Sequence, residues 1–104
     1  MRARHAGAMF TTLALSLTAS VWAQPFPSKS VRYVVPFGAG AAPDTGARII
    51  TAKLTRVWNQ QVIVENRVGV AGMLGADFVA KSPPNGYTLF QCNVASNAIS
   101  PVLY

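Results

Sequence analysis

Residue types that commonly carry chemistry are scarce in this 104-residue chain, which has one cysteine, one histidine and three acidic residues. Cys92 has no partner for an internal disulfide, and its apolar neighbours predict that it packs as a small hydrophobic side chain. The histidine is His5, so residues 24–104 lack the commonest general base and metal ligand. The acidic residues lie far apart in sequence: Asp44, Glu65 and Asp77. We therefore expect no catalytic residue, metal site or cofactor.

Clusters of charge are also absent. Residues 24–104 carry seven basic and three acidic residues, a net charge of +4, and the basic residues occur singly. A nucleic-acid surface requires clustered basic side chains, so we expect a solvated surface and no nucleic-acid binding. A mild positive charge is compatible with a small anionic ligand.

The N-terminal stretch has the layout of a secretory signal peptide. Arg2 and Arg4 begin it, an apolar segment of residues 8–21 follows, and small side chains lie at Val21 and Ala23. The apolar segment is shorter than the roughly 20 residues that span a bilayer. We therefore expect cleavage after Ala23 and export to the periplasm, with an uncleaved membrane anchor as the alternative.

The most informative segment joins the apolar run 31–35 to a loop of small residues and the start of a helix at Pro43 or Asp44. Free amides of such a loop and the positive end of a helix dipole favour an anion, either carboxylate or phosphate. Asp44 itself is interpreted as a helix-capping or water-positioning acid in preference to a direct ligand contact, because a carboxylate repels an anion. The candidate binding residues here are Phe37, Gly38, Ala39, Gly40, Ala41, Ala42 and Asp44.

The remaining pattern predicts alternating strands and helices. An apolar helix face follows the first loop, with Ala47, Ile50, Leu54, Val57 and Trp58 at helical spacing. Further elements are expected as a strand at 62–64, a helix at 72–81, a strand at 87–92, and a polar loop at 93–97. A β-α-β-α-β order implies a parallel sheet, whose carboxyl-end loops 37–43, 65–71 and 93–97 should open on one side.

At this level of detail the chain resembles the extracytoplasmic solute-binding receptors of tripartite tricarboxylate transporters, often called Bug proteins. Six segments carry the resemblance in order and spacing, across nearly all of residues 24–104: residues 27–37, Pro43-Asp-Thr-Gly-Ala-Arg48, Val64-Glu-Asn-Arg67, Gly72-Met-Leu-Gly-Ala76, residues 80–89 and residues 97–104.

The resemblance implies a type II periplasmic-binding-protein fold, in which two α/β lobes close over a small carboxylate or related metabolite. Residues 24–104 would form part of the first lobe. The resemblance also implies a non-enzymatic, monomeric receptor that delivers its solute to membrane permease subunits. In such relatives the carboxylate is held by the first strand–helix loop and by a facing polar loop, which adds Ser96 and Asn97 to the candidate residues.

One departure from the family pattern concerns the first loop, where Ala41 occupies a position that is commonly glycine. If this position requires a positive φ, Ala41 is strained and the loop misshaped. Such departures are compatible with an alternative in which the chain is a non-functional truncated relic.

An enzymatic alternative is a dinucleotide-binding domain of an oxidoreductase. Gly38 and Gly40 form a near match to the glycine-rich fingerprint, and Glu65 ends the second expected strand. Pro43 replaces the third glycine, however, and the exported location is poor in nicotinamide cofactors.

Overall fold

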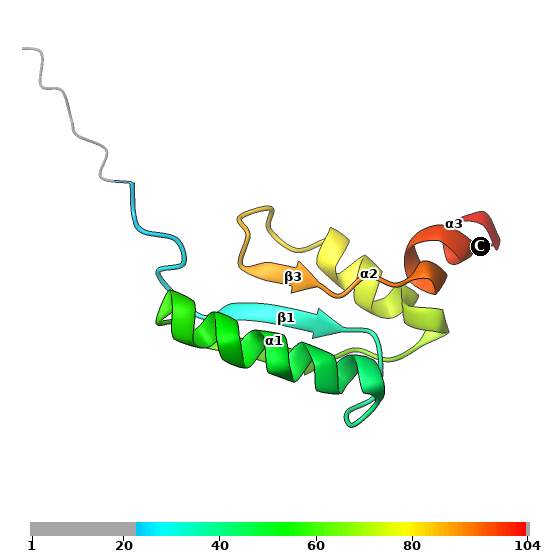
Figure 1. Cartoon of the computed structure of the whole chain (residues 1–104). Helices are drawn as coiled ribbons and strands as arrows, with labels where there is room; N and C mark the ends of the chain where they lie inside the picture. Colours follow the sequence, from blue (N-terminus) through cyan, green and yellow to red (C-terminus); the bar gives the residue numbers. More distant parts are fainter. Residues whose placement is uncertain (1–22, 104) are drawn as a thin grey trace, which may run out of the picture.

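The structure, a computed structural model, describes residues 23–103 and contains three strands and three α-helices within that range (Figure 1). A 3₁₀ turn (Val70–Gly72) precedes α2, and a π-helical turn (Ala95–Ile99) precedes α3. The expected signal peptide lies outside the described residues, apart from Ala23. The regular elements are β1 (Val31–Val35), α1 (Ala42–Trp58), β2 (Val62–Asn66), α2 (Met73–Ala80), β3 (Thr88–Phe90) and α3 (Ser100–Leu103).

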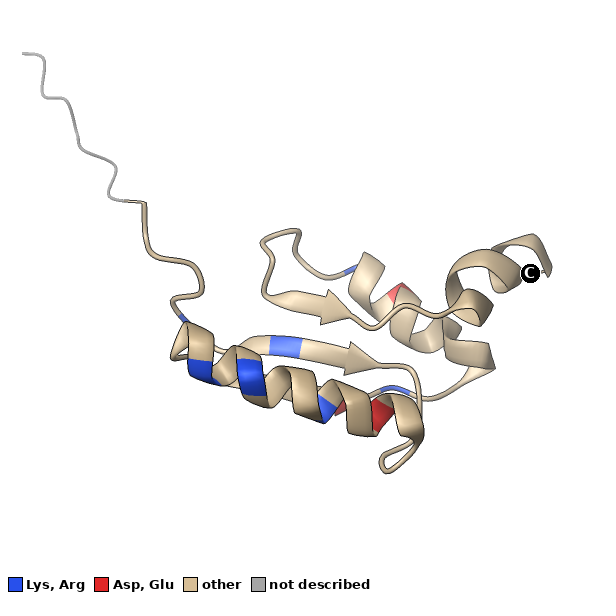
Figure 2. Cartoon of the chain, viewed as in Figure 1, with Lys and Arg blue, Asp and Glu red and all other residues tan. Residues whose placement is uncertain are grey.

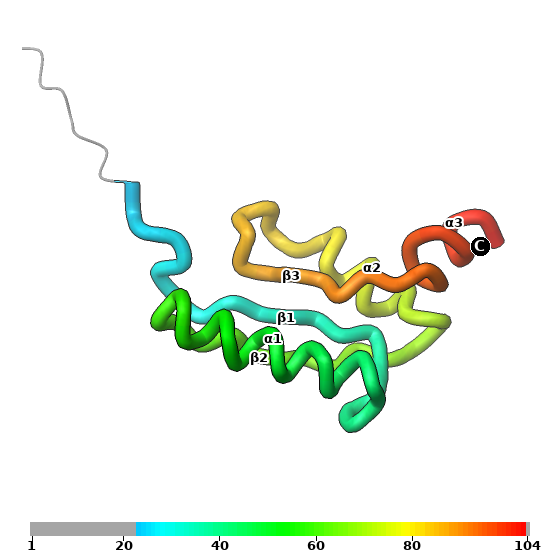
Figure 3. Tube along the Cα trace, in the orientation of Figure 1, coloured from blue at the N-terminus to red at the C-terminus, as the bar shows by residue number. Residues whose placement is uncertain are grey.

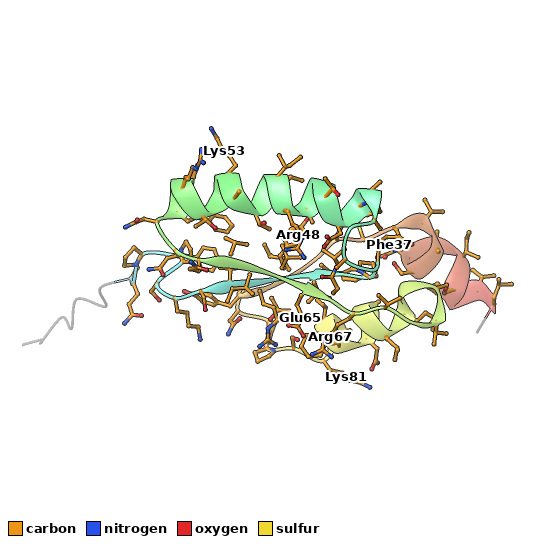
Figure 4. The ribbon with its side chains drawn as sticks, turned by 90° about the horizontal axis from the view of Figure 1, so that it is seen from below. Phe37, Arg48, Lys53, Glu65, Arg67 and Lys81 are labelled. Carbon is orange, nitrogen blue, oxygen red and sulfur yellow. The ribbon has the colours of Figure 1, made fainter. Side chains whose placement is uncertain are left out.

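The strands form one parallel sheet in the order β2-β1-β3. The chain passes from β1 through α1 to β2 at one edge, and then back through α2 to β3 on the other side of β1 (Figure 3). Consequently α1 and α2 cover opposite faces of the sheet (Figure 4). This arrangement confirms the predicted parallel β-α-β-α-β order.

The core is centred on β1. Val31, Val34 and Val35 are fully buried, and Ala47 of α1 and Val62 of β2 complete the buried apolar set. A central parallel strand is covered on both faces, which explains its nearly continuous apolar sequence.

The apolar face predicted for α1 is buried only in part. Ile50 and Val57 are 50% and 66% exposed, whereas Asp44, Ala47 and Thr51 are buried. Polar side chains can face the sheet because they are hydrogen-bonded there; the Thr51 hydroxyl donates to the Arg48 carbonyl at 3.2 Å. The helical spacing of apolar residues alone therefore did not identify the buried face.

The second strand is longer than predicted because backbone pairing continues through polar residues. Glu65 and Asn66 pair with Val34 and Val35 of β1, so the strand ends at Asn66 and not at residue 64. The third strand is shorter than predicted and ends at Phe90.

The predicted polar loop at 93–97 is wrong, because the chain is helical from Val94 onward. The Asn93 Oδ1 accepts a hydrogen bond from the backbone N–H of Ser96 at 2.9 Å, as a helix-capping side chain does. The prediction that Cys92 is packed is also wrong: it follows the β3 ladder and its side chain is exposed.

Within residues 23–103, no helix has the length and apolar character needed to cross a membrane. The same residues contain no group of three or more metal-ligating side chains. Basic residues are spread over β1, α1 and the segments that follow β2 and α2 (Figure 2).

A matched pair of valine substitutions tests the position of the core. Val34→Ala should lower the free energy of unfolding by about 1–3 kcal/mol, because Val34 is fully buried in the central strand. Val57→Ala should change it by less than about 0.5 kcal/mol, since Val57 is exposed and alanine favours helix. Urea unfolding followed by circular dichroism measures both, and equal losses would contradict the assignment of α1's buried face.

Candidate functional site

The three strands are parallel, so their carboxyl ends lie at one edge of the sheet; Figure 1 shows this for β1 and β3. The Gln91 Nε2 donates to the Pro43 carbonyl at 3.2 Å and so joins the end of β3 to the start of α1. A Cβ placed on Gly72 would lie 3.1 Å from the Pro36 Cβ and 3.3 Å from the Ser96 Cβ. The expectation that the carboxyl-end segments open on one side is therefore confirmed.

The strand order β2-β1-β3 gives this edge a further property. The segment after β1 leads to α1 on one face, whereas the segment after β2 leads to α2 on the other. In open α/β sheets, ligands bind outside the carboxyl ends of the strands where successive connections diverge in this way. The candidate binding loop, residues 37–44, lies at such a position.

The backbone of the candidate loop is unstrained at Ala41. Its φ and ψ are −66° and 157°, which is extended backbone, and the left-handed residue is Gly40, with a φ of 86°. The strain considered for Ala41 is therefore absent, because the position that requires glycine is one residue earlier and does carry glycine. Left-handed non-glycine residues occur outside the loop, at Asn59 after α1 and at Val70 and Ala71 after β2, with φ values of 50°, 45° and 54°.

Two amides of the loop have partners inside the loop. The Gly40 N–H donates to the Asp44 Oδ2 at 2.9 Å, and the Ala41 N–H donates to the Gly38 carbonyl at 3.2 Å. Within residues 23–103, no acceptor is found for the amides of Gly38, Ala39 and Ala42. The exposed end of α1 thus retains donors for a ligand.

Asp44 is the most constrained of the candidate residues. Its side chain is 1% exposed, and its Oδ2 accepts from Arg48 Nε at 2.8 Å as well as from Gly40. Its Oδ1 accepts from Asn66 Nδ2 at 2.8 Å. These bonds, the one from Arg48 foremost, hold the pKa of the Asp44 carboxyl far below its usual range. Asp44 is thus ionised and neutralised by Arg48.

The role expected of Asp44 is partly confirmed. It is a first-turn acid that accepts a backbone amide, but the N-cap position of α1 belongs to Ala41, which makes no side-chain capping bond. Direct contact of Asp44 with a ligand stays a prediction.

The two candidate residues beyond β3 differ in exposure. Ser96 is 5% exposed, and its hydroxyl donates to the Asn97 Oδ1 at 2.6 Å; Asn97 is exposed. Two buried side-chain atoms nearby along the chain, Gln91 Oε1 and Asn93 Nδ2, have no hydrogen-bond partner among the described residues. The sequence analysis did not name Gln91, Arg48 or Asn66 as site residues. Gln91 and Asn66 could have been found, because each is a polar residue at the carboxyl end of an apolar strand.

Two cavities of the described chain lie away from residues 37–44. The larger, about 460 Å³, is at the amino ends of the strands, lined among others by Lys29, Arg32 and Tyr87. The smaller, about 280 Å³, lies between α2 and the C-terminal helical segment and includes Ser96. The candidate loop itself faces solvent: Gly38, Ala39, Gly40 and Ala42 are exposed.

Comparison with known proteins identifies the class. Residues 46–104 match the tripartite tricarboxylate transporter family receptor. BugT of Bordetella pertussis is 38% identical over 73 residues, which cover 70% of this chain and 22% of BugT. The UPF0065 protein in the tcbD-tcbE intergenic region of Pseudomonas sp. strain P51 is 48% identical over 64 residues, or 62% of this chain and 19% of that protein.

Solved structures agree with this class. Two proteins of Rhodopseudomonas palustris, one with adipate and one (MatC) with bound malate, match with TM-scores of 0.61 and 0.60 and identities of 40% and 43%. Each match covers 62% of this chain and 22% of the solved chain. The fold of residues 23–103 thus matches part of the fold of periplasmic solute-binding proteins.

The chain belongs to the tripartite tricarboxylate transporter receptor family. It spans about a fifth of the length of the relatives BugT and the strain P51 protein. Because this family consists of solute-binding receptors, the expectation of a non-enzymatic protein is confirmed, and the dinucleotide-binding oxidoreductase is the wrong alternative.

The buried carboxylate predicts a specific acid dependence of stability. The folded pKa of Asp44 is lowered, so its contribution is present above the unfolded pKa of about 3.9 and is lost as pH falls below that value. Urea unfolding across about pH 3 to pH 7 should therefore show a loss of stability on the acid side, and Asp44→Asn should flatten that loss while lowering stability at neutral pH.

Asp77→Asn provides the matched control, because Asp77 is an exposed acid of α2 paired with Lys81 at 2.8 Å. This variant should lose stability on the acid side to the same extent as wild type. If the Asp44→Asn protein lost stability at acid pH as wild type does, a group other than Asp44 would be responsible for that loss.

Proposed function

We propose that this chain is part of the ligand-binding lobe of a periplasmic receptor for small carboxylates, which delivers its solute to the permease subunits of a tripartite transporter. The observation that carries the proposal is the exposed amino end of α1. Within residues 23–103 the amides of Ala42, and of Gly38 and Ala39 in the loop before the helix, have no acceptor, and they lie at the edge of a parallel sheet where ligands commonly bind.

The electrostatics of this edge support an anionic ligand. Asp44 is the one acidic residue of the loop 37–44, and its carboxylate is buried and neutralised by Arg48 at 2.8 Å. The positive end of the α1 dipole therefore acts on a ligand without an opposing free carboxylate beside it. This pairing supports an anion site beside an acid, because it weakens the repulsion that a free carboxylate would exert.

The ligand class is supported by relatives. Structures of similar proteins from Rhodopseudomonas palustris contain adipate and malate, both of which are dicarboxylates. We therefore propose a dicarboxylate, one of whose carboxylates contacts residues 37–44, with Ser96 and Asn97 contributing from the segment after β3.

Location and domain organisation follow from the same proposal. Residues 1–23 would act as a cleaved signal peptide and residues 24–104 as part of the first lobe, in agreement with relatives described as periplasmic proteins. Closure of a second lobe over the solute would present the receptor to the permease, since a ligand favours the conformation that binds it better.

Amide chemical shifts of the ¹⁵N-labelled chain test the proposal directly. Adipate should shift the amides of residues 37–44 with a dissociation constant in the millimolar range, about 4 kcal/mol of binding free energy, because one lobe contacts the ligand from one side only. Adipamide, which has the same length but no charge, should cause no such shifts.

Two results would contradict the proposal. If about 50 mM adipate leaves the amide shifts of residues 37–44 unchanged, these residues do not form an anion site. This concentration far exceeds a millimolar dissociation constant. Nanomolar binding in titration calorimetry would show that lobe closure is not needed.

A further inference from the structure

Asn66, the last residue of β2, connects that strand to both ends of the candidate loop. Its Nδ2 donates to the Phe37 carbonyl at 2.8 Å and to the Asp44 Oδ1 at 2.8 Å. Its Oδ1 accepts from an Arg48 NH2 group at 3.4 Å. One planar amide group therefore contacts the residue where the loop begins, the residue where it ends, and the cation that neutralises Asp44.

Asp44 extends this restraint to the middle of the loop. While its Oδ1 is held by Asn66, its Oδ2 accepts the Gly40 N–H at 2.9 Å. The loop is thus fixed at its start, its middle and its end. The amides of Gly38 and Ala39, which have no acceptor within residues 23–103, lie between the first two fixed points.

We propose that Asn66 is a positioning residue for the carboxylate site: it holds the loop of residues 37–44 in the shape that presents its free amides, without touching the ligand itself. This inference rests on the proposed function. A loop that is already fixed loses little conformational entropy when the ligand binds, so its affinity is higher than that of a mobile loop.

The chemistry of the contact explains why asparagine stands at this position. The amide supplies two donors and an acceptor on one short side chain. An aspartate would retain the acceptor for Arg48, but it has no N–H for Phe37 and would place a second carboxylate beside Asp44. An alanine would leave the buried Asp44 with one partner fewer.

The Asn66→Ala chain, labelled with ¹⁵N and ¹³C, tests the proposal with three measurements. Exchange of the Gly40 amide with solvent should accelerate at least about tenfold, while the sheet amides of Val31 and Gln91 keep their wild-type rates. The Asp44 carboxyl signal should titrate at a higher pH than in wild type, because a bond that lowers its pKa is lost. Adipate affinity, measured from the shifts of residues 37–44, should fall about tenfold.

Asn85→Ala is the matched control. Asn85 lies in the turn before β3, at the opposite end of the sheet, where its side chain accepts the Tyr87 N–H at 3.1 Å. This variant should leave Gly40 exchange, the Asp44 titration and adipate binding unchanged. If Asn66→Ala does not fold, Asn66→Asp replaces it, because it is nearly isosteric and also lacks the two donors.

Each outcome decides one of the two proposals. Unchanged Gly40 exchange and Asp44 titration in the Asn66 variant would overturn the positioning role. Faster Gly40 exchange with unchanged adipate affinity would overturn it too, while leaving the carboxylate receptor intact. If wild-type residues 37–44 do not respond to adipate, the proposed function fails, and the exchange measurement still decides whether Asn66 fixes the loop.

Discussion

The buried carboxylate of Asp44 is the constraint on which the arrangement of this lobe depends. A buried charge is tolerated only when it is paired and hydrogen-bonded, and its partners here come from three different places. Arg48 lies one turn further along α1, Gly40 belongs to the preceding loop, and Asn66 ends the neighbouring strand. Satisfying this one group therefore fixes the loop, the first helix and the second strand relative to one another.

The same contacts distinguish the role of Asp44 from the role proposed for the loop amides. Asp44 accepts the Gly40 amide, whereas the amides of Gly38, Ala39 and Ala42 have no acceptor within residues 23–103 and are the donors proposed for an anion. Pairing with Arg48 removes the net charge that would otherwise oppose that anion. This chain can thus carry an acid in the first turn of α1 beside the candidate loop, because the carboxylate is buried and paired with Arg48.

Particular elements show how far the sequence could predict this structure. The continuous apolar run of β1, the helical spacing after Pro43 and the alternation of elements predicted a parallel α/β fold correctly, because each rests on local periodicity. The exposure of Ile50 and Val57, the helical turn at 95–99 and the exposed Cys92 were predicted wrongly. Each of these depends on which neighbour a residue meets across the fold, and periodicity does not contain that information.

The sequence by itself determined the order of the elements and the resemblance to a receptor family, since these reside in residue types and their spacing. Only the tertiary structure decided which face of α1 is buried, that Gly40 and not Ala41 takes the left-handed turn, and that Asn66 reaches Asp44 across 22 positions of chain. The physical reason is that a hydrogen bond between distant residues depends on strand pairing. That pairing brings the ends of β1 and β2 side by side, and no local pattern specifies the side chains that then meet.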